Sequence, residues 1–177
     1  MENPPRLYIS LKGCTFNSAN KGSKQIYLTN CKELILENCI FENNDISDYG
    51  LDVNLCGVLG ANIRISNCVF KNNGTKSAIS IKQRRGPTDH PTDITNSQGT
   101  IASVLIEECS FEGNIIDMKV GTSPKGEDTE ANTSTGNYPL IIRNNNTDMK
   151  IQLTYLAGKD EIPQEIIIKA KEYKSFN

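Results

Sequence analysis

The acidic side chains offer the most direct route to catalysis in this sequence. Asp52 and Asp117 occupy outward positions on two predicted strands, Leu51–Leu55 and Ile116–Val120. If the two strands lie two layers apart in a stacked sheet, their carboxyl groups are separated by about 9.6 Å. An inverting glycosidase needs two carboxyl groups about 6.5–9.5 Å apart. The spacing is at the outer limit for catalysis, so solvated aspartates on an outward face are the preferred interpretation.

The histidine and the cysteines are candidates for a nucleophilic pair or a metal site. Cys56 is the cysteine that fits the repeat pattern least, and nothing in the sequence brings it to His90. The chain has 1 histidine and no Cys-x-x-Cys pair, so the usual zinc spacings are absent. Asp45, Asp48 and Asp52 lack the spacing of a calcium loop. The sequence therefore predicts no metal and no cofactor, and it favours a protein that is not an enzyme.

Charged loops are the candidate binding sites. Segments 82–102 and 121–138 are rich in Gly, Pro, Ser, Thr and Asn, which is typical of loop insertions. Recognition residues concentrate on loops carried by a rigid scaffold, and arginine is favoured at the energetic centres of interfaces. The candidate binding residues are the charged side chains Lys82, Arg84, Arg85, Lys125, Glu127 and Asp128.

A repeated phrase must build the scaffold that positions these side chains. An apolar residue is followed by Cys, Phe and Asn at nearly constant spacing in Leu11–Cys14–Phe16–Asn20, Leu36–Cys39–Phe41–Asn43, Ile65–Cys68–Phe70–Asn72 and Ile106–Cys109–Phe111–Asn114, with a decayed copy at Ile142–Asn145. Such self-similarity indicates one supersecondary unit stacked on itself. We expect the cysteines to be reduced and stacked in the interior, because free Cys behaves as a small buried hydrophobe. The asparagines should occupy tight turns and stack as an amide ladder.

Each unit begins with alternating apolar residues, such as Leu34 and Leu36 or Val104 and Ile106, which predicts a strand. A second strand follows each turn. The units, exemplified by the segment Ile65–Asn73, resemble the right-handed parallel β-helix of the pectate-lyase-like superfamily over roughly residues 6–157. This resemblance implies an all-β fold: a short right-handed parallel β-helix, or solenoid, of about five coils. It implies no particular activity, because the superfamily includes lyases, hydrolases, epimerases, phage tailspikes and non-catalytic modules.

The chain is accordingly divided into a β-helix domain, 1–157, and a C-terminal capping segment, 158–177. Ile166–Ile168 favours a strand in the capping segment, whereas Ile162, Ile166, Ala170 and Tyr173 also fit a helical stripe. An uncovered end of a stack exposes unpaired backbone groups and apolar side chains. Homodimerisation at an end or a side therefore stays open as an alternative to a complete cap.

Composition narrows the partner class. The net charge of −2 weighs against a generic nucleic-acid or anionic-membrane binder. No apolar run approaches the roughly 20 residues that span a bilayer. The start, Met1–Pro5, shows no secretory signal, and with reduced cysteines this favours a cytoplasmic protein.

Two function classes remain from these observations. The favoured one is a non-catalytic protein-binding β-helix, such as an inhibitor or immunity-type factor from a phage or mobile element. The alternative is a carbohydrate-binding or polysaccharide-active module of the lyase or hydrolase kind. Sugar sites usually expose aromatic rings for stacking, and the candidates for that role are Tyr27, Tyr49, Tyr138 and Tyr155.

Overall fold

The chain forms β-strands and no helix over the residues that the computed structural model describes. These are residues 7–17, 25–29, 31–44, 50–55, 59–73, 77–83, 101–120, 138–153 and 164–176. The prediction of an all-β chain dominated by parallel strands is confirmed for this part of the sequence.

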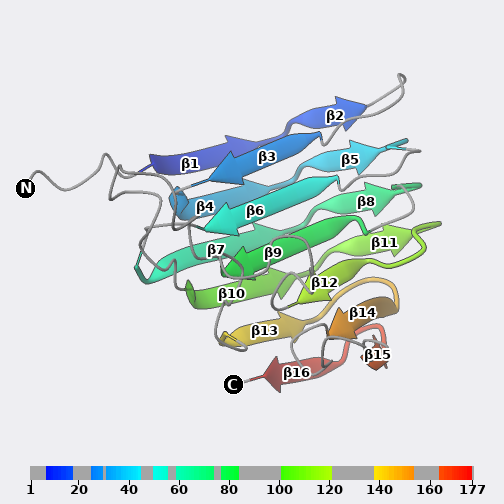
Figure 1. Cartoon of the computed structure of the whole chain (residues 1–177). Coiled ribbons are helices and arrows are strands. Elements are labelled where there is room, and N and C mark those ends of the chain that lie inside the picture. The colour runs from blue at the N-terminus through cyan, green and yellow to red at the C-terminus, as the bar shows by residue number, and fades with distance from the viewer. Residues whose placement is uncertain are drawn as a thin grey trace, which may run out of the picture.

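The strands are arranged in three sheets, called sheets A, B and C (Figure 1). Sheet A contains, in spatial order, β1 (Leu7–Lys12), β4 (Cys31–Glu37), β7 (Ala61–Ser66), β10 (Ile101–Glu107), β13 (Leu140–Arg143) and β16 (Tyr173–Phe176). Sheet B contains β2 (Thr15–Asn17), β5 (Ile40–Glu42), β8 (Val69–Lys71) and β11 (Ser110–Glu112). Sheet C contains β3 (Ile26–Thr29), β6 (Leu51–Leu55), β9 (Ile79–Gln83), β12 (Met118–Val120), β14 (Met149–Leu153) and β15 (Gln164–Ile168).

Each repeat contributes one strand to each sheet in turn. From β1 to β12 the strands enter sheets A, B and C in strict rotation, and every neighbouring pair among them is parallel. The decayed fifth copy supplies β13 and β14 but no strand of sheet B. The last two strands differ, because β15 and β16 pair antiparallel with β14 and β13.

Left-handed turns separate the strands of each repeat. Asn38 and Asn67 precede the repeated cysteines with φ of 55° and 53°, and Asn43 and Asn72 follow the phenylalanines with φ of 58° and 52°. Asparagine tolerates this backbone region better than other non-glycine residues. The predicted turn role of Asn43 and Asn72 is confirmed.

The phenylalanines and cysteines of the repeats form stacked columns in the interior. Ring centroids are 4.8 Å apart for Phe16–Phe41, 4.8 Å for Phe41–Phe70 and 5.4 Å for Phe70–Phe111. The four repeated cysteines are free. Cys39, Cys68 and Cys109 are buried, and Cys14 is partly buried. The predictions of stacked rings and of stacked, reduced thiols are both confirmed.

A column of buried asparagine amides lies in the interior. The sequence predicted this column at the repeat asparagines, but in two of the repeats it is formed by the next residue, Asn44 or Asn73. Asn73 and Asn44 are each 2% exposed, and they follow the turn residues Asn72 and Asn43. The Asn73 side chain donates to the carbonyl oxygen of Phe41 at 2.9 Å, and Asn114 donates to that of Phe70 at 2.9 Å. The left-handed residue bends the chain, so the residue after it is the one whose side chain turns inward.

The C-terminal segment resolves the choice between strand and helix. Residues 164–168 and 173–176 form β15 and β16, which extend sheets C and A by one strand each. Ile168 is 3% exposed and packs on the core. The strand interpretation is therefore correct for these residues, and the helical alternative is wrong for them.

Candidate functional site: the outer face of sheet A

Most of the candidate loop residues lie outside the described residues. This holds for Arg84, Arg85, Lys125, Glu127 and Asp128, and also for Cys56, His90, Asp45, Asp48, Tyr49 and Tyr155. Lys82 lies on β9, where its backbone pairs with that of Asn54. The proposed role of these side chains in binding stays a prediction.

The predicted solvation of Asp52 and Asp117 is wrong. Asp52 is 0% exposed and Asp117 is 7% exposed. Asp117 accepts hydrogen bonds from the Asn114 side chain at 2.9 Å and from the backbone N–H of Lys150 at 2.7 Å. Burial raises the pKa of the Asp117 carboxyl. The alternation of apolar and polar residues along a strand predicts the direction of a side chain. It does not predict whether that side chain is exposed to solvent.

The same two aspartates are also poorly placed as a catalytic pair. Ser80 is in register with both Asp52 and Lys119, so Asp117 lies two residues before the position that matches Asp52. Two strands across and two residues along give a separation of about 12 Å. An inverting pair needs about 6.5–9.5 Å, so the register argues against this alternative. Among the described residues, no group of at least 3 His, Cys, Asp and Glu side chains could hold a metal ion.

Of the four tyrosines considered for sugar stacking, the two that the structure describes, Tyr27 and Tyr138, do not share an exposed surface. Tyr27 is 50% exposed, but Tyr138 is 1% exposed and its hydroxyl donates to the carbonyl oxygen of Ile81 at 3.0 Å. Tyr138 is therefore a core residue, and the expectation that it could stack on a sugar is wrong.

A different surface, the outer face of sheet A, gathers functional side chains of several kinds. One row in register across the sheet consists of Lys12, Glu37, Ser66, Glu107, Arg143 and Tyr173. The neighbouring row consists of Ser10, Ile35, Arg64, Leu105, Ile141 and Ser175. Since these strands are hydrogen-bonded to each other along their length, the two rows have a fixed geometry.

Glu107 holds two arginines in place at the centre of this face. Its Oε1 accepts from Arg64 Nη2 at 2.9 Å, and its Oε2 accepts from Arg143 Nη2 at 2.7 Å. The Nε atoms of both arginines donate to the same carboxylate at 3.2 and 2.9 Å. The Glu107 side chain is 9% exposed, whereas Arg64 and Arg143 are 58% and 45% exposed. Both guanidinium groups are thus fixed in orientation while one side of each stays open to solvent.

The electrostatics of this cluster favour the ionised form of Glu107. Burial alone would raise the pKa of its carboxyl, but the hydrogen bonds and charges of Arg143 and Arg64 outweigh burial and lower it. Each arginine donates two charge-assisted hydrogen bonds to one carboxylate oxygen of Glu107, and hydrogen bonds between ionised groups are shorter and stronger than neutral ones.

Apolar side chains interrupt the polar pattern of this face. Ile35, Leu105 and Ile141 are half-buried at positions where alternation calls for polar residues. Tyr8 and Tyr173 are each 61% exposed at opposite edges of the sheet. The aliphatic stem of Arg64 lies in the same row, between Ile35 and Leu105.

The sequence contains a signal for this surface that the repeated phrase does not capture. Three strands contain uninterrupted apolar triplets in place of alternation, namely Leu34–Leu36, Val104–Ile106 and Leu140–Ile142. The middle residue of each triplet must point away from the core that its neighbours fill. In-register triplets on several strands therefore predict an apolar strip on the outer face.

Removing the negative charge at Glu107 should weaken the fold in a pH-dependent way. Because the pKa of Glu107 is lowered in the folded state, its stabilisation is present above the unfolded-state pKa of about 4.3 and is lost as the pH falls through the lower folded value. Glu107→Gln should cost about 1 kcal/mol at pH 7, since the exposed arginines are rehydrated. Urea unfolding at pH 7 and pH 3 should show the difference from wild type shrinking at pH 3.

Glu37→Gln is the matched control for this experiment. Glu37 pairs with Lys12 at 2.7 Å on the same row, but its side chain is 36% exposed and that of Lys12 is 64% exposed. Its replacement should change stability less than that of Glu107 at pH 7. Equal effects of the two substitutions would show that the double arginine contact adds nothing to the stability of the sheet.

The described residues define an all-β protein with mostly parallel sheets, and on the outer face of sheet A two partly exposed arginines are held by Glu107. No protein-family model matches the chain, and neither a curated protein nor a solved structure is significantly similar to it. No helix among the described residues could cross a membrane.

Proposed function

We propose that the chain is a short right-handed parallel β-helix of about five coils whose C-terminal segment partly caps one end. The rotation of successive strands among sheets A, B and C supports this fold. So do the columns of rings and thiols, because identical residues stack only where coils repeat in register. The right-handed sense rests on the strong preference for right-handed connections between parallel strands of one sheet.

We further propose that this β-helix is a non-catalytic protein-binding module that uses the outer face of sheet A. The observation that carries the proposal is the apolar strip of Ile35, Leu105 and Ile141 beside two arginines held by Glu107. Interfaces are enriched in Arg and Tyr around a core depleted of charge. A rigid sheet that already fixes its arginines loses little side-chain entropy on binding. An inhibitor or immunity-type factor would use such a face.

The same geometry suggests the chemistry of the partner surface. The open sides of Arg64 and Arg143 favour carboxylates, and the strip beside them favours aliphatic or aromatic side chains. The partner should therefore present an apolar patch with acidic residues at its rim. The charged residues of the predicted loops, including Arg84 and Arg85, would add contacts beyond the sheet.

The test compares Ile141→Glu with Ile40→Glu. Ile141 lies on the proposed face, whereas Ile40 lies on β5 of sheet B and is 37% exposed. A partner captured by the wild-type chain in lysate from its native cell is purified, and its affinity is measured by calorimetry. Ile141→Glu should weaken binding at least tenfold, since it places a charge in the apolar centre of the interface.

The control substitution should leave affinity unchanged, and both variants should keep the circular dichroism spectrum of the wild type. Unchanged affinity in Ile141→Glu, or equal losses in both variants, would remove sheet A from the interface.

A further inference from the structure

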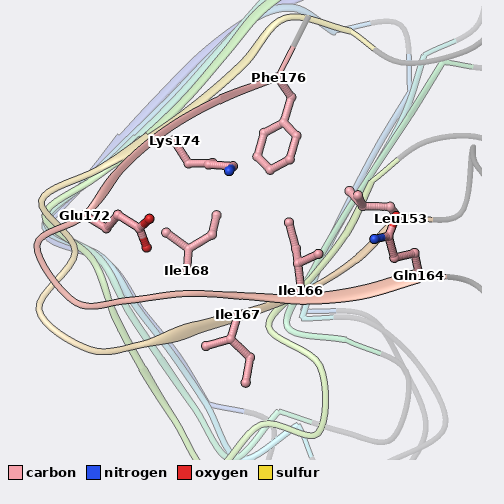
Figure 2. A pocket seen from close by; sticks show the side chains of 8 residues that line it. All are labelled: Leu153, Gln164, Ile166, Ile167, Ile168, Glu172, Lys174 and Phe176. Atoms are coloured by element: carbon pink, nitrogen blue, oxygen red, sulfur yellow. The ribbon is translucent and has the colours of Figure 1, made fainter.

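The C-terminal end of the stack contains a cavity that the sheet A surface does not include. The cavity has a volume of about 380 Å³ and lies between β15 and β16 (Figure 2). Its apolar walls are formed by Leu153, Ile166, Ile168 and Phe176. Ile167, the exposed neighbour of Ile166 and Ile168, points away from the interior in the same view. The volume falls within the range of about 300–1,000 Å³ that is typical of binding pockets.

A lysine on the inward-facing side of sheet A lies beside this cavity. One interior column of sheet A is apolar from layer to layer until it reaches β16, and it consists of Leu11, Leu36, Ile65, Ile106, Ile142 and Lys174. Leu36, Ile65, Ile106 and Ile142 are each 0% exposed. The Lys174 ammonium group lies over the cavity in Figure 2, and no side chain among the described residues forms a hydrogen bond or ion pair with it.

Within the part of the chain that the structure describes, the strand that carries Lys174 has a free edge. Among the described strands, β16 is the last of sheet A and pairs only with β13. The N–H of Asn144 donates to the carbonyl oxygen of Glu172 at 3.2 Å, so the backbone of Glu172 faces β13. Backbone groups alternate sides along a strand. Those of Tyr173 and Ser175 therefore face the free edge and can pair with a further strand.

We infer that the free edge of β16 receives an extended segment of a partner protein as an added antiparallel strand. The segment places an acidic side chain opposite Lys174 and an apolar side chain opposite Phe176, at the mouth of the cavity. In strand addition, backbone hydrogen bonds give affinity and pockets for alternate side chains give specificity. The inference rests on the proposed protein-binding function, and it names a second surface and the motif that this surface accepts.

The direction of the added strand fixes the order of the motif. An antiparallel segment meets Phe176 before Lys174, so its sequence is apolar residue, any residue, acidic residue. The middle residue points to the outer face of the sheet and should matter little. If the acidic residue is moved by one position, its side chain points to the outer face of the sheet and no longer contacts Lys174.

The experiment uses fluorescein-labelled octapeptides and the full chain, with fluorescence anisotropy as the readout. The test peptide is Thr-Val-Thr-Leu-Thr-Glu-Thr-Thr. A second peptide has Lys in place of Glu, and a third moves Glu one position toward Leu. Wild-type protein should bind the test peptide about fivefold more tightly than either of the other two, the range expected for a partly exposed charge pair.

Lys174→Glu supplies the matched protein variant. Lys174 is exposed at the end of the stack, so the substitution should leave the circular dichroism spectrum unchanged. This variant should reverse the preference and bind the Lys peptide more tightly than the Glu peptide. Ile141→Glu should bind all three peptides as the wild type does, which separates this surface from the one on sheet A.

Three results would overturn the inference. One is the absence of binding to wild-type protein at about 1 mM test peptide, a concentration that detects even weak association. Another is binding that does not respond to the charge at position 174 or to the position of Glu in the peptide. The third is a stable wild-type dimer that dissociates in Lys174→Glu, because the free edge would then serve a second copy of the chain.

Discussion

Replacing Phe70 with alanine is expected to lower the free energy of unfolding by about 3–5 kcal/mol, the usual cost of deleting a buried aromatic ring. Phe70 is 0% exposed and stacks on a ring at either side, with centroids 4.8 Å from Phe41 and 5.4 Å from Phe111. Its removal leaves a cavity between two layers whose backbones are held apart by sheet hydrogen bonds. The structure therefore cannot collapse to fill the space, which puts the cost at the upper part of the range.

The control for Phe70→Ala is Phe16→Ala in the same column. Phe16 is only partly buried at the end of the column, and Phe41 is its single ring neighbour among the described residues, at 4.8 Å. Chemical denaturation with urea should show a clearly smaller loss for Phe16→Ala. Equal losses at the two positions would mean that stacking between layers contributes little and that burial of the ring alone sets its contribution.

The interior of the fold could be predicted because its side chains repeat at one position per layer. Parallel in-register strands place equivalent residues on top of each other, so Phe41 and Phe70 had to stack once their segments were recognised as repeats. The turn role of Asn43 and Asn72 could also be predicted from the sequence, because few other non-glycine residues take positive φ without strain. In both cases the same structural role recurs at the same position of each repeat, so the residue type at that position indicates the role.

The outer surface was less predictable because alternation determines direction and not environment. Asp52 lies in register with Ser80, at a position of β6 that alternation assigns to the outer face, and it is nevertheless 0% exposed. The register between β6 and β12 displaced Asp117 from Asp52 by two residues, because segments of different length precede the two strands. The apolar strip on sheet A was encoded locally, in triplets such as Val104–Ile106, but a search for alternation alone does not detect it.

Replacing Asn73 with aspartate is expected to destabilise the fold by about 3–5 kcal/mol at pH 7, the cost of a buried charge without a compensating partner. The Asn73 side chain is 2% exposed, and its amide group donates to the Phe41 carbonyl at 2.9 Å and to Asn114 Oδ1 at 3.3 Å. A carboxylate has no proton to donate and would place its charge against these two oxygen atoms. The amide column would therefore lose its bond between layers and gain a repulsive contact.

The pH dependence of Asn73→Asp separates the cost of the buried charge from a simple loss of packing. Burial raises the pKa of the new carboxyl in the folded state, so its protonated form is favoured there and can donate a hydrogen bond again. The destabilisation relative to wild type should therefore be smallest near pH 4 and grow as the pH rises through the raised pKa. Asn62→Asp is the control, because Asn62 is exposed on β7 and accepts a hydrogen bond from Ser103 at 2.9 Å, which a carboxylate can also do. This substitution should change stability by less than about 0.5 kcal/mol. A destabilisation of Asn73→Asp that stays constant between pH 4 and pH 7 would contradict the role assigned to the amide column.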